Sequence, residues 1–219
     1  MPREAGSEIP GPGRLIAIGD IHGRLAKLED LLGQIQPRAD DRLVFLGDYV
    51  DRGPDSYKVV ERLISLRCEL PSTVLLRGNH EAFLLALFRE PVHGQRQVWL
   101  ERDGGWATIA SYQEAGQYPI VHRDFFESLP LTFETERFFF CHAGVRPGIA
   151  LDRQREDDLL TIREPFLSSN ANFGKVVVHG HTVVEHPQIL PNRINLDTGA
   201  GEGRPLTALD LGAMSLWQA

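Results

Sequence analysis

Short apolar runs recur along the chain, and each of them ends at a cluster of polar residues. The runs read LIAIGDIHG (15–23), LVFLGDYVDRG (43–53), TVLLRGNHE (73–81), FFFCHAG (138–144) and KVVVHGHT (175–182). Their apolar parts have the length and the composition of buried β-strands. The pattern therefore predicts strands that deliver polar side chains at their carboxyl ends.

Between the first three runs, apolar residues are spaced three and four positions apart, which is typical of helices. The spacing is carried by Leu25, Leu28, Leu31 and Leu32 in one segment and by Val59, Val60, Leu63 and Ile64 in the next. Strands that alternate with helices predict βαβ units, a largely parallel sheet and polar clusters at one sheet edge. Residues 206–218, LTALDLGAMSLWQ, predict a final antiparallel pair of strands.

The domain organisation is expected to be simple. Residues 1–13 are polar and rich in Gly and Pro, which predicts a flexible leader before a single domain at 14–219. Residues 90–130 break the alternation and predict a helical insertion. A chain of 219 residues that is 42% hydrophobic and 24% charged is long enough to bury one core.

Charge and cysteine content narrow the choice of partners and location. The net charge of −7 argues against a nucleic-acid partner, because such proteins neutralise phosphates with a basic face. The two cysteines are too few for a disulfide framework, and no apolar run approaches the roughly 20 residues of a membrane helix. With no signal-peptide pattern at the N-terminus, we expect a cytoplasmic protein without a membrane partner.

The polar clusters, gathered at one edge, supply carboxylates, imidazoles and an amide. The candidates are Asp20, His22, Asp48, Asp51, Arg52, Asn79, His80, His142 and His181. Such donors suit Mn²⁺, Fe²⁺ or Zn²⁺ and exceed the needs of one ion. A pair of ions about 3.5–4 Å apart needs a bridging carboxylate, which we expect to be Asp48 on the middle strand. His93, His122 and His186 lie outside the clusters and are predicted to be surface or loop residues.

These motifs resemble those of a known family. GDIHG, GDYVDRG, RGNHE, CHAG and HGHT, in this order and spacing, resemble the phosphoprotein phosphatase family of calcineurin-like metallophosphoesterases, in its compact bacterial and phage form. WLERDGGW (99–106), IRE (162–164) and LDTGA (196–200) extend the likeness over nearly all of residues 14–211. The resemblance implies an α/β fold of two packed mixed β-sheets flanked by helices, an αββα sandwich, with a dinuclear metal site.

The resemblance also implies roles for individual residues. Asp20, His22 and Asp48 would hold one divalent ion, and Asp48, Asn79, His142 and His181 would hold the other. Mn²⁺ is the expected metal, with Fe and Zn as alternatives. His80 would be the general acid, Asp51 would orient it, and Arg52 and Arg163 would bind phosphate oxygens. A hydroxide that bridges the metals would attack phosphorus directly, without a covalent phosphoenzyme.

For the substrate, the sequence leads to an expectation with two alternatives. We expect a metal-dependent phosphatase for phosphoserine and phosphothreonine in proteins, with phosphotyrosine and small phosphoesters as further substrates. The alternative is a symmetrical diadenosine tetraphosphate hydrolase, whose motifs resemble GDLVARG and GNHD. Asp51 and Glu81 stand where those motifs have Ala and Asp, which favours the phosphatase. An inactive metal-binding scaffold is the other alternative, and it would require a missing ligand, whereas none is missing.

Overall fold

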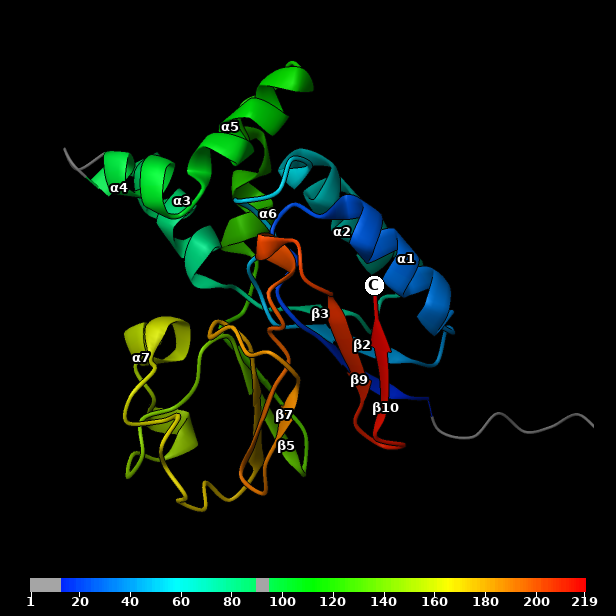
Figure 1. Cartoon of the computed structure of the whole chain (residues 1–219), viewed down its shortest axis with the longest axis vertical. Helices are drawn as coiled ribbons and strands as arrows, with labels where there is room; N and C mark the ends of the chain where they lie inside the picture. The colour runs from blue at the N-terminus through cyan, green and yellow to red at the C-terminus, as the bar shows by residue number, and fades with distance from the viewer. Residues whose placement is uncertain (1–12, 90–94) are drawn as a thin grey trace, which may run out of the picture.

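Two five-stranded β-sheets form the centre of the molecule in a computed structural model that describes residues 13–89 and 95–219. The strand order is β10-β9-β1-β2-β3 in the first sheet and β4-β5-β6-β8-β7 in the second. The two sheets lie against each other, and helices cover their outer faces (Figure 1). The predicted α/β sandwich of two mixed sheets is therefore confirmed.

The strands of the first sheet are β1 (Leu15–Ile18), β2 (Arg42–Phe45), β3 (Val74–Leu75), β9 (Thr207–Asp210) and β10 (Ser215–Gln218). Those of the second sheet are β4 (Thr132–Glu134), β5 (Phe138–Cys141), β6 (Val176–His179), β7 (Gln188–Ile189) and β8 (Arg193–Asn195). The helices are α1 (Leu25–Ile35), α2 (Ser56–Glu69), α3 (Asn79–Arg89), α4 (Gln95–Arg102), α5 (Gly105–Glu114), α6 (Arg123–Glu127) and α7 (Glu156–Thr161). Short 3₁₀ turns are η1 (Pro119–His122), η2 (Leu151–Arg153) and η3 (Ala200–Glu202).

Parallel strands place the polar clusters at a common edge in both sheets. In the first sheet β1, β2 and β3 run parallel, with Ile18 opposite Phe45, and α1 and α2 form the connections between them. In the second sheet β5, β6 and β8 run parallel, with antiparallel β4 and β7 at the two edges. The predicted antiparallel pair at the end of the chain is β9 with β10.

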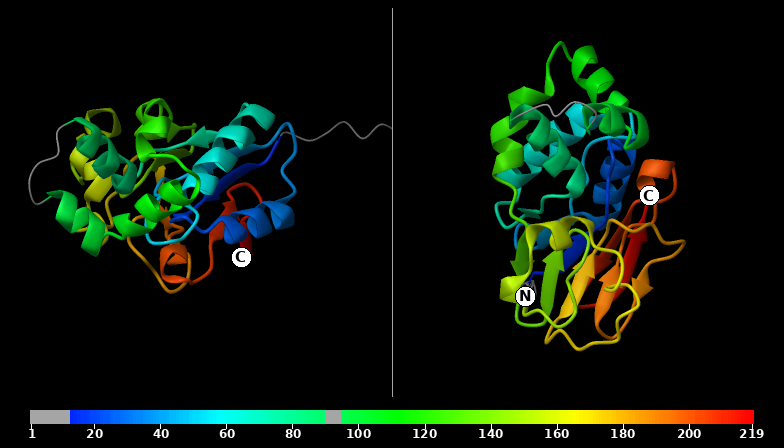
Figure 2. Two further views of the ribbon diagram at one scale, coloured as in Figure 1. Left: turned by 90° about the horizontal axis from the view of Figure 1, so that it is seen from above. Right: turned by 90° about the vertical axis from the view of Figure 1, so that its left-hand side faces the viewer.

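The core consists of three apolar layers because alternate strand residues face opposite sides of a sheet. Along β5, Phe138 and Phe140 face the first sheet, whereas Phe139 and Cys141 face the outer layer with α7. In β2, Val44 likewise joins the layer between the sheets, and its neighbours pack under the helices. In the right-hand view of Figure 2, α7, drawn in yellow, lies on the viewer's side of the second sheet. This sandwich holds the carboxyl ends of both sets of parallel strands in place.

Helices α4, α5 and α6, with η1, lie beside α2 and α3 at one end of the first sheet (Figure 1). His122 in η1 is buried, which contradicts its prediction as a surface histidine. Its two ring nitrogens lie 2.7 Å from the Tyr112 hydroxyl and 2.6 Å from Glu61 Oε1, so both are satisfied. His186 is exposed as predicted, and His93 lies outside the described residues.

The predicted leader at 1–13, apart from Gly13, lies outside the described residues. The boundaries of the single domain and of the 90–130 insertion stay predictions. In the part of the chain that the structure describes, no helix has both the length and the apolar character needed to cross a membrane.

Candidate active site

The predicted site residues come from the carboxyl ends of strands in both sheets. Asp20 and His22 follow β1, and Asp48, Asp51 and Arg52 follow β2. Asn79 and His80 begin α3 just after β3, while His142 follows β5 and His181 follows β6. Most of these side chains are buried, although Asn79 and His181 are partly exposed and Arg52 is exposed. Two sheets thus contribute donors to one place.

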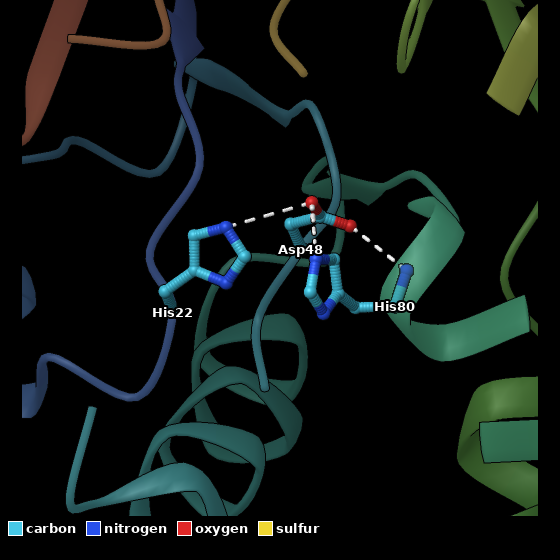
Figure 3. A group of neighbouring side chains, drawn as sticks. All are labelled: His22, Asp48 and His80. Carbon is cyan, nitrogen blue, oxygen red and sulfur yellow. Dashed lines mark hydrogen bonds and ion pairs between the residues drawn. The ribbon is translucent and has the colours of Figure 1, made fainter. Parts of the chain in front are cut away.

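Asp48 lies at the centre of this group and presents its two carboxylate oxygens to different histidines. Asp48 Oδ2 is 3.6 Å from His22 Nε2 and 3.7 Å from His80 Nε2 (Figure 3). Asp48 Oδ1 accepts a hydrogen bond from the His80 backbone N–H at 3.1 Å and lies 3.4 Å from His142 Nε2. A carboxylate in this position is suited to bridge two cations.

Two groups of donors share Asp48. His22, Asp48 and His80 form one group, and Asp48, His142 and His181 form the other, with the ligand atoms of each within 4.8 Å of one another. Such groups are able to hold metal ions. The first group differs from the ligand set that the resemblance implies. It contains His80, whereas the implied set contains Asp20 beside His22 and Asp48.

Asn79 connects the histidines of the second group. Its Oδ1 lies 2.8 Å from His142 Nε2 and 2.9 Å from His181 Nδ1. The amide oxygen therefore points to the same place as the two imidazoles. Asp20 lies beside them, since its Oδ2 accepts a hydrogen bond from the His181 backbone N–H at 3.0 Å.

The orientation of the imidazoles fits metal binding. His22 donates its Nδ1–H to the Val50 carbonyl at 2.9 Å, and His142 donates its Nδ1–H to the Leu46 carbonyl at 2.8 Å. Each therefore directs its Nε2 toward Asp48, the orientation in which metal-bound histidines commonly present that nitrogen. Asp20 Oδ1 and His181 Nε2 are buried without a hydrogen-bond partner among the described residues, so they retain a free lone pair. The donor set fits divalent cations.

Electrostatics favour a cation at the same place. Burial and the charge of Asp197 raise the pKa of Asp20 well above its ordinary value. Burial also raises the pKa of Asp197, and the charge of Asp48 adds to this effect. Buried carboxylates that repel one another become stable as anions when positive charge is bound between them. Asp197 is part of the LDTGA motif (196–200), which by itself predicts no role for this residue.

His80 and Asp51 form a buried pair beside this group. His80 donates its Nδ1–H to Asp51 Oδ2 at 2.7 Å. Burial alone would lower the pKa of His80, but the carboxylates of Asp48 and Asp51 raise it above its ordinary value. The pair therefore favours a protonated imidazole, as a proton donor requires.

Both predicted phosphate-binding arginines are exposed on the site side of the molecule. The Arg52 backbone N–H donates to the Gly104 carbonyl at 3.1 Å, and its side chain lies beside Gly201. Arg163 lies close enough to His181 for its charge to contribute, after burial and His142, to lowering the pKa of His181 to about 3. Exposed guanidinium groups of this kind are suited to bind an anion.

Glu81 organises the backbone of the loop after β2, a role that the sequence does not reveal. Its fully buried carboxylate accepts hydrogen bonds from the backbone N–H groups of Asp48 at 2.9 Å, Tyr49 at 2.8 Å and Gly78 at 2.9 Å. These bonds tie the loop after β2 to the start of α3. Glu81 therefore determines where Asp48 lies.

Much of the site backbone is left-handed. Positive φ angles occur at His22 (49°), Asp48 (53°), Asp51 (72°), Arg52 (66°) and His181 (64°). Residues other than glycine adopt this conformation uncommonly, and when they do they concentrate at functional sites.

Two groups of metal-binding donors at the strand ends of a two-sheet sandwich indicate a metal-dependent hydrolase of phosphoesters, and the comparison with known families agrees. The calcineurin-like phosphoesterase family model matches residues 13–204, and the chain belongs to this family. Members of this family use a pair of divalent metal ions, which agrees with the two donor groups around Asp48.

Similar curated proteins carry a more specific name. Asymmetrical bis(5′-nucleosyl)-tetraphosphatase PrpE of Oceanobacillus iheyensis is 28% identical, covering 87% of this chain and 86% of its own. The protein of that name from Halalkalibacterium halodurans is 29% identical, covering 88% and 87%.

Solved structures give a related picture. A crystal structure described as a putative diadenosine tetraphosphatase has a TM-score of 0.74 and 28% identity, covering 95% of this chain and 93% of that one. A cold-active protein tyrosine phosphatase has a TM-score of 0.60 and 18% identity, covering 95% and 79%. At 18% identity the second likeness concerns the fold alone.

The prediction of a phosphoserine and phosphothreonine phosphatase is wrong, because the relatives are named tetraphosphatases. It depended on Asp51 and Glu81, and the structure explains why they do not report on the substrate. Asp51 is fully buried against His80, and Glu81 is bound to loop N–H groups. Both side chains therefore contact groups inside the protein, namely His80 and the loop after β2, and hydrolysis of any phosphoester would depend on these groups.

Proposed function

We propose that this chain is a metal-dependent hydrolase of dinucleoside tetraphosphates that cleaves them asymmetrically into a nucleoside monophosphate and a nucleoside triphosphate. The observation that carries this proposal is the agreement between two relatives that span 87% and 88% of the chain and a structure with a TM-score of 0.74. The alternative considered from the sequence was symmetrical cleavage, which yields two diphosphates. The names of both relatives favour the asymmetrical reaction.

The metal ligands follow from the donors around Asp48. We propose that Asp20, His22 and Asp48 hold one ion and that Asp48, Asn79, His142 and His181 hold the other. Mn²⁺ is the first candidate, with Fe and Zn as alternatives, since oxygen and imidazole donors suit all three. Bound there, the ions would supply Lewis acidity toward phosphoryl oxygens and lower the pKa of a water molecule.

Three residues of the chain would donate the proton and bind the charged oxygens during hydrolysis. In the overall reaction, water adds its oxygen to one phosphorus, the P–O bond of the anhydride breaks, and a proton goes to the departing oxygen. We propose that His80 supplies that proton from Nε2, a role supported by the hydrogen bond of its Nδ1–H to Asp51 at 2.7 Å. Arg52 and Arg163 would bind nonbridging oxygens, where charge accumulates in the transition state.

The test is product analysis with diadenosine tetraphosphate and added Mn²⁺, with AMP, ADP and ATP separated by ion-exchange chromatography at early times. We expect AMP and ATP in equal amounts and no ADP. Two molecules of ADP per substrate would overturn asymmetrical cleavage. Turnover of p-nitrophenyl phosphate with no nucleotide product would overturn the substrate class.

The same experiment addresses the scaffold alternative. The sequence contains every proposed ligand, and the contacts of Asp48, Asn79 and Asp20 with neighbouring histidines support an active enzyme. A protein that binds Mn²⁺ but hydrolyses neither substrate would be a scaffold. An Asp48→Asn variant serves as the background control, because activity of a contaminating phosphatase would survive this substitution.

A further inference from the structure

Asp51 is held by side chains from α4 and α5 as well as by His80. We propose that Trp99 and Thr108 are positioning residues that aim the Asp51 carboxylate, and through it the His80 imidazole, at the departing oxygen. The proposal deepens the proposed function and rests on it for the role of His80. The proposal assigns a positioning role to α4 and α5, which contain none of the predicted ligands.

Three donors satisfy the Asp51 carboxylate. Trp99 donates its Nε1–H to Asp51 Oδ2 at 2.7 Å, the same oxygen that accepts from His80. Thr108 donates its hydroxyl to Asp51 Oδ1 at 2.5 Å. Trp99 is 2% exposed, and Asp51 and Thr108 are fully buried, so water does not compete for these bonds. The carboxylate plane is therefore fixed from both of its oxygens.

The turn between α4 and α5 and the α5 helix also hold the backbone of the loop after β2. The Asp51 N–H donates to Thr108 Oγ1 at 2.8 Å and also lies 3.1 Å from Ser56 Oγ. The next N–H, that of Arg52, donates to the Gly104 carbonyl at 3.1 Å. Asp51 and Arg52 are consecutive residues with left-handed backbone, with φ of 72° and 66°. A strained conformation persists only where its surroundings enforce it, and α4 and α5 provide that enforcement here.

Glycines allow this close approach. A Cβ atom at Gly104, where φ is +85°, would lie 2.7 Å from the Arg52 nitrogen. A Cβ atom at Gly105 would lie 2.4 Å from Cε2 of the Trp99 ring. Neither position accommodates a side chain without moving the loop or the indole. The turn between α4 and α5 is therefore built to bring Trp99 and Thr108 to Asp51.

Loss of either donor would free the carboxylate to rotate and would misalign His80. A general acid acts only when it lies within hydrogen-bond distance of the departing group, so misalignment lowers kcat and leaves KM nearly unchanged. The metal ligands are untouched by such a change. The expected defect is thus in kcat and not in metal content.

The experiment compares Thr108→Val, which removes the hydroxyl at nearly constant shape, with Thr108→Ser, which keeps it. Ser111→Ala is the matched control, since Ser111 also lies on α5 and its buried hydroxyl accepts from the Tyr57 N–H at 3.1 Å, away from Asp51. We expect Thr108→Val to lower kcat about 10- to 100-fold, with Thr108→Ser and Ser111→Ala within about threefold of wild type. Metal content, measured by atomic emission, should be equal in all of them.

A double-mutant cycle distinguishes positioning from general loosening. In an Asp51→Asn background, Thr108→Val should cause no further loss of kcat, because its effect passes through Asp51. Additive losses would overturn the proposal, as would equal kcat values for Thr108→Val and Thr108→Ser. If Thr108→Val does not fold, Trp99→Phe takes its place in the cycle, with the same expectations.

One readout requires no substrate. The His80 Nδ1–H in a buried 2.7 Å hydrogen bond should give a downfield proton NMR signal, assigned by its loss in His80→Asn. In protein incubated with diamagnetic Zn²⁺, the signal should persist in Thr108→Ser and Ser111→Ala and shift or broaden in Thr108→Val. An unchanged signal in Thr108→Val overturns the positioning role. Absence of tetraphosphate hydrolysis with a shifted signal would instead overturn only the proposed function.

Discussion

Asp48 Oδ1 lies 3.4 Å from His142 Nε2, so a carboxylate of the first sheet meets an imidazole of the second. Each residue follows a strand of its own sheet, β2 or β5. The contact joins the two donor groups, because Asp48 belongs to both.

The first prediction concerns this shared carboxylate. Asp48→Asn removes the negative charge between the two donor groups. We expect fewer than two ions per chain and a kcat at least about 10²-fold below that of wild type. Metal content after gel filtration and kcat at saturating Mn²⁺ are the measurements. Asp55→Asn, in the same loop region but paired with Lys58 at 3.3 Å, is the control and should bind metal like wild type. Two tightly bound ions in Asp48→Asn would contradict the bridging role.

The second prediction separates proton donation from metal binding at His80. His80→Asn should lower kcat about 10²- to 10⁴-fold with a full complement of metal, since a general acid contributes that much. Exposed His186→Asn is the control and should retain wild-type kcat. If His80→Asn loses an ion instead, His80 is a ligand of the group it forms with His22 and Asp48.

The third prediction concerns the contact between α5 and η1. Tyr112→Phe removes the hydroxyl 2.7 Å from His122 Nδ1 and leaves a buried ring nitrogen without its partner. The free energy of unfolding should fall by about 1–2 kcal/mol. Urea unfolding followed by circular dichroism measures the change. Tyr118→Phe, at a side chain that is 72% exposed, should change it by less than about 0.5 kcal/mol.

The fourth prediction is a pH dependence of stability. The Asp41 carboxylate accepts from the Arg14 and Arg38 backbone N–H groups at 2.9 and 2.8 Å, and also pairs with both guanidinium groups. Although burial opposes ionisation, the hydrogen bonds from Arg14 and Arg38 hold the pKa of Asp41 well below its ordinary value. Because the pKa is lower in the folded state, this stabilisation is complete above the unfolded pKa of about 4 and is lost as pH falls through the folded value.

Asp41→Asn should therefore lower the free energy of unfolding by roughly 2 kcal/mol at pH 7, with the difference from wild type shrinking below about pH 4. Urea titrations at pH 7, 5, 4 and 3 follow the change. Asp40→Asn is the neighbouring control. Asp40 is exposed, and its ion pair with Arg38 Nε is long, at 3.6 Å, so the effect of this substitution on the free energy of unfolding should be small at every pH. A constant difference down to pH 3 would rule out the proposed linkage.

The first sheet and the gathering of the candidate ligands at its strand ends could be predicted from the sequence, because apolar strands and polar ends alternate there. The second sheet could not be derived from pattern, since β4, β7 and β8 are two or three residues long and contain polar residues. For that sheet the resemblance supplied the answer. Short strands at sheet edges depend on their neighbours and carry little pattern of their own.

The residues that the sequence did not reveal act through other residues. Trp99 and Thr108 lie in helices whose spacing predicts only a core, and the Asp51 contact depends on how α4 and α5 turn at Gly104. Substrate choice failed for a related reason. Asp51 reaches His80, Trp99 and Thr108 inside the protein, so its identity reflects loop architecture rather than the group that is hydrolysed.

The left-handed residues of the site have a consequence for engineering. Five of the seven non-glycine residues with positive φ among the described residues are candidate ligands or catalytic residues, and a non-glycine residue in this conformation costs about 1–2 kcal/mol. Glycine at these positions would relax the backbone and remove the chemistry at once. Selection for thermal stability alone would thus drive this chain toward an inert variant, so a screen for sturdier forms has to score hydrolysis in parallel.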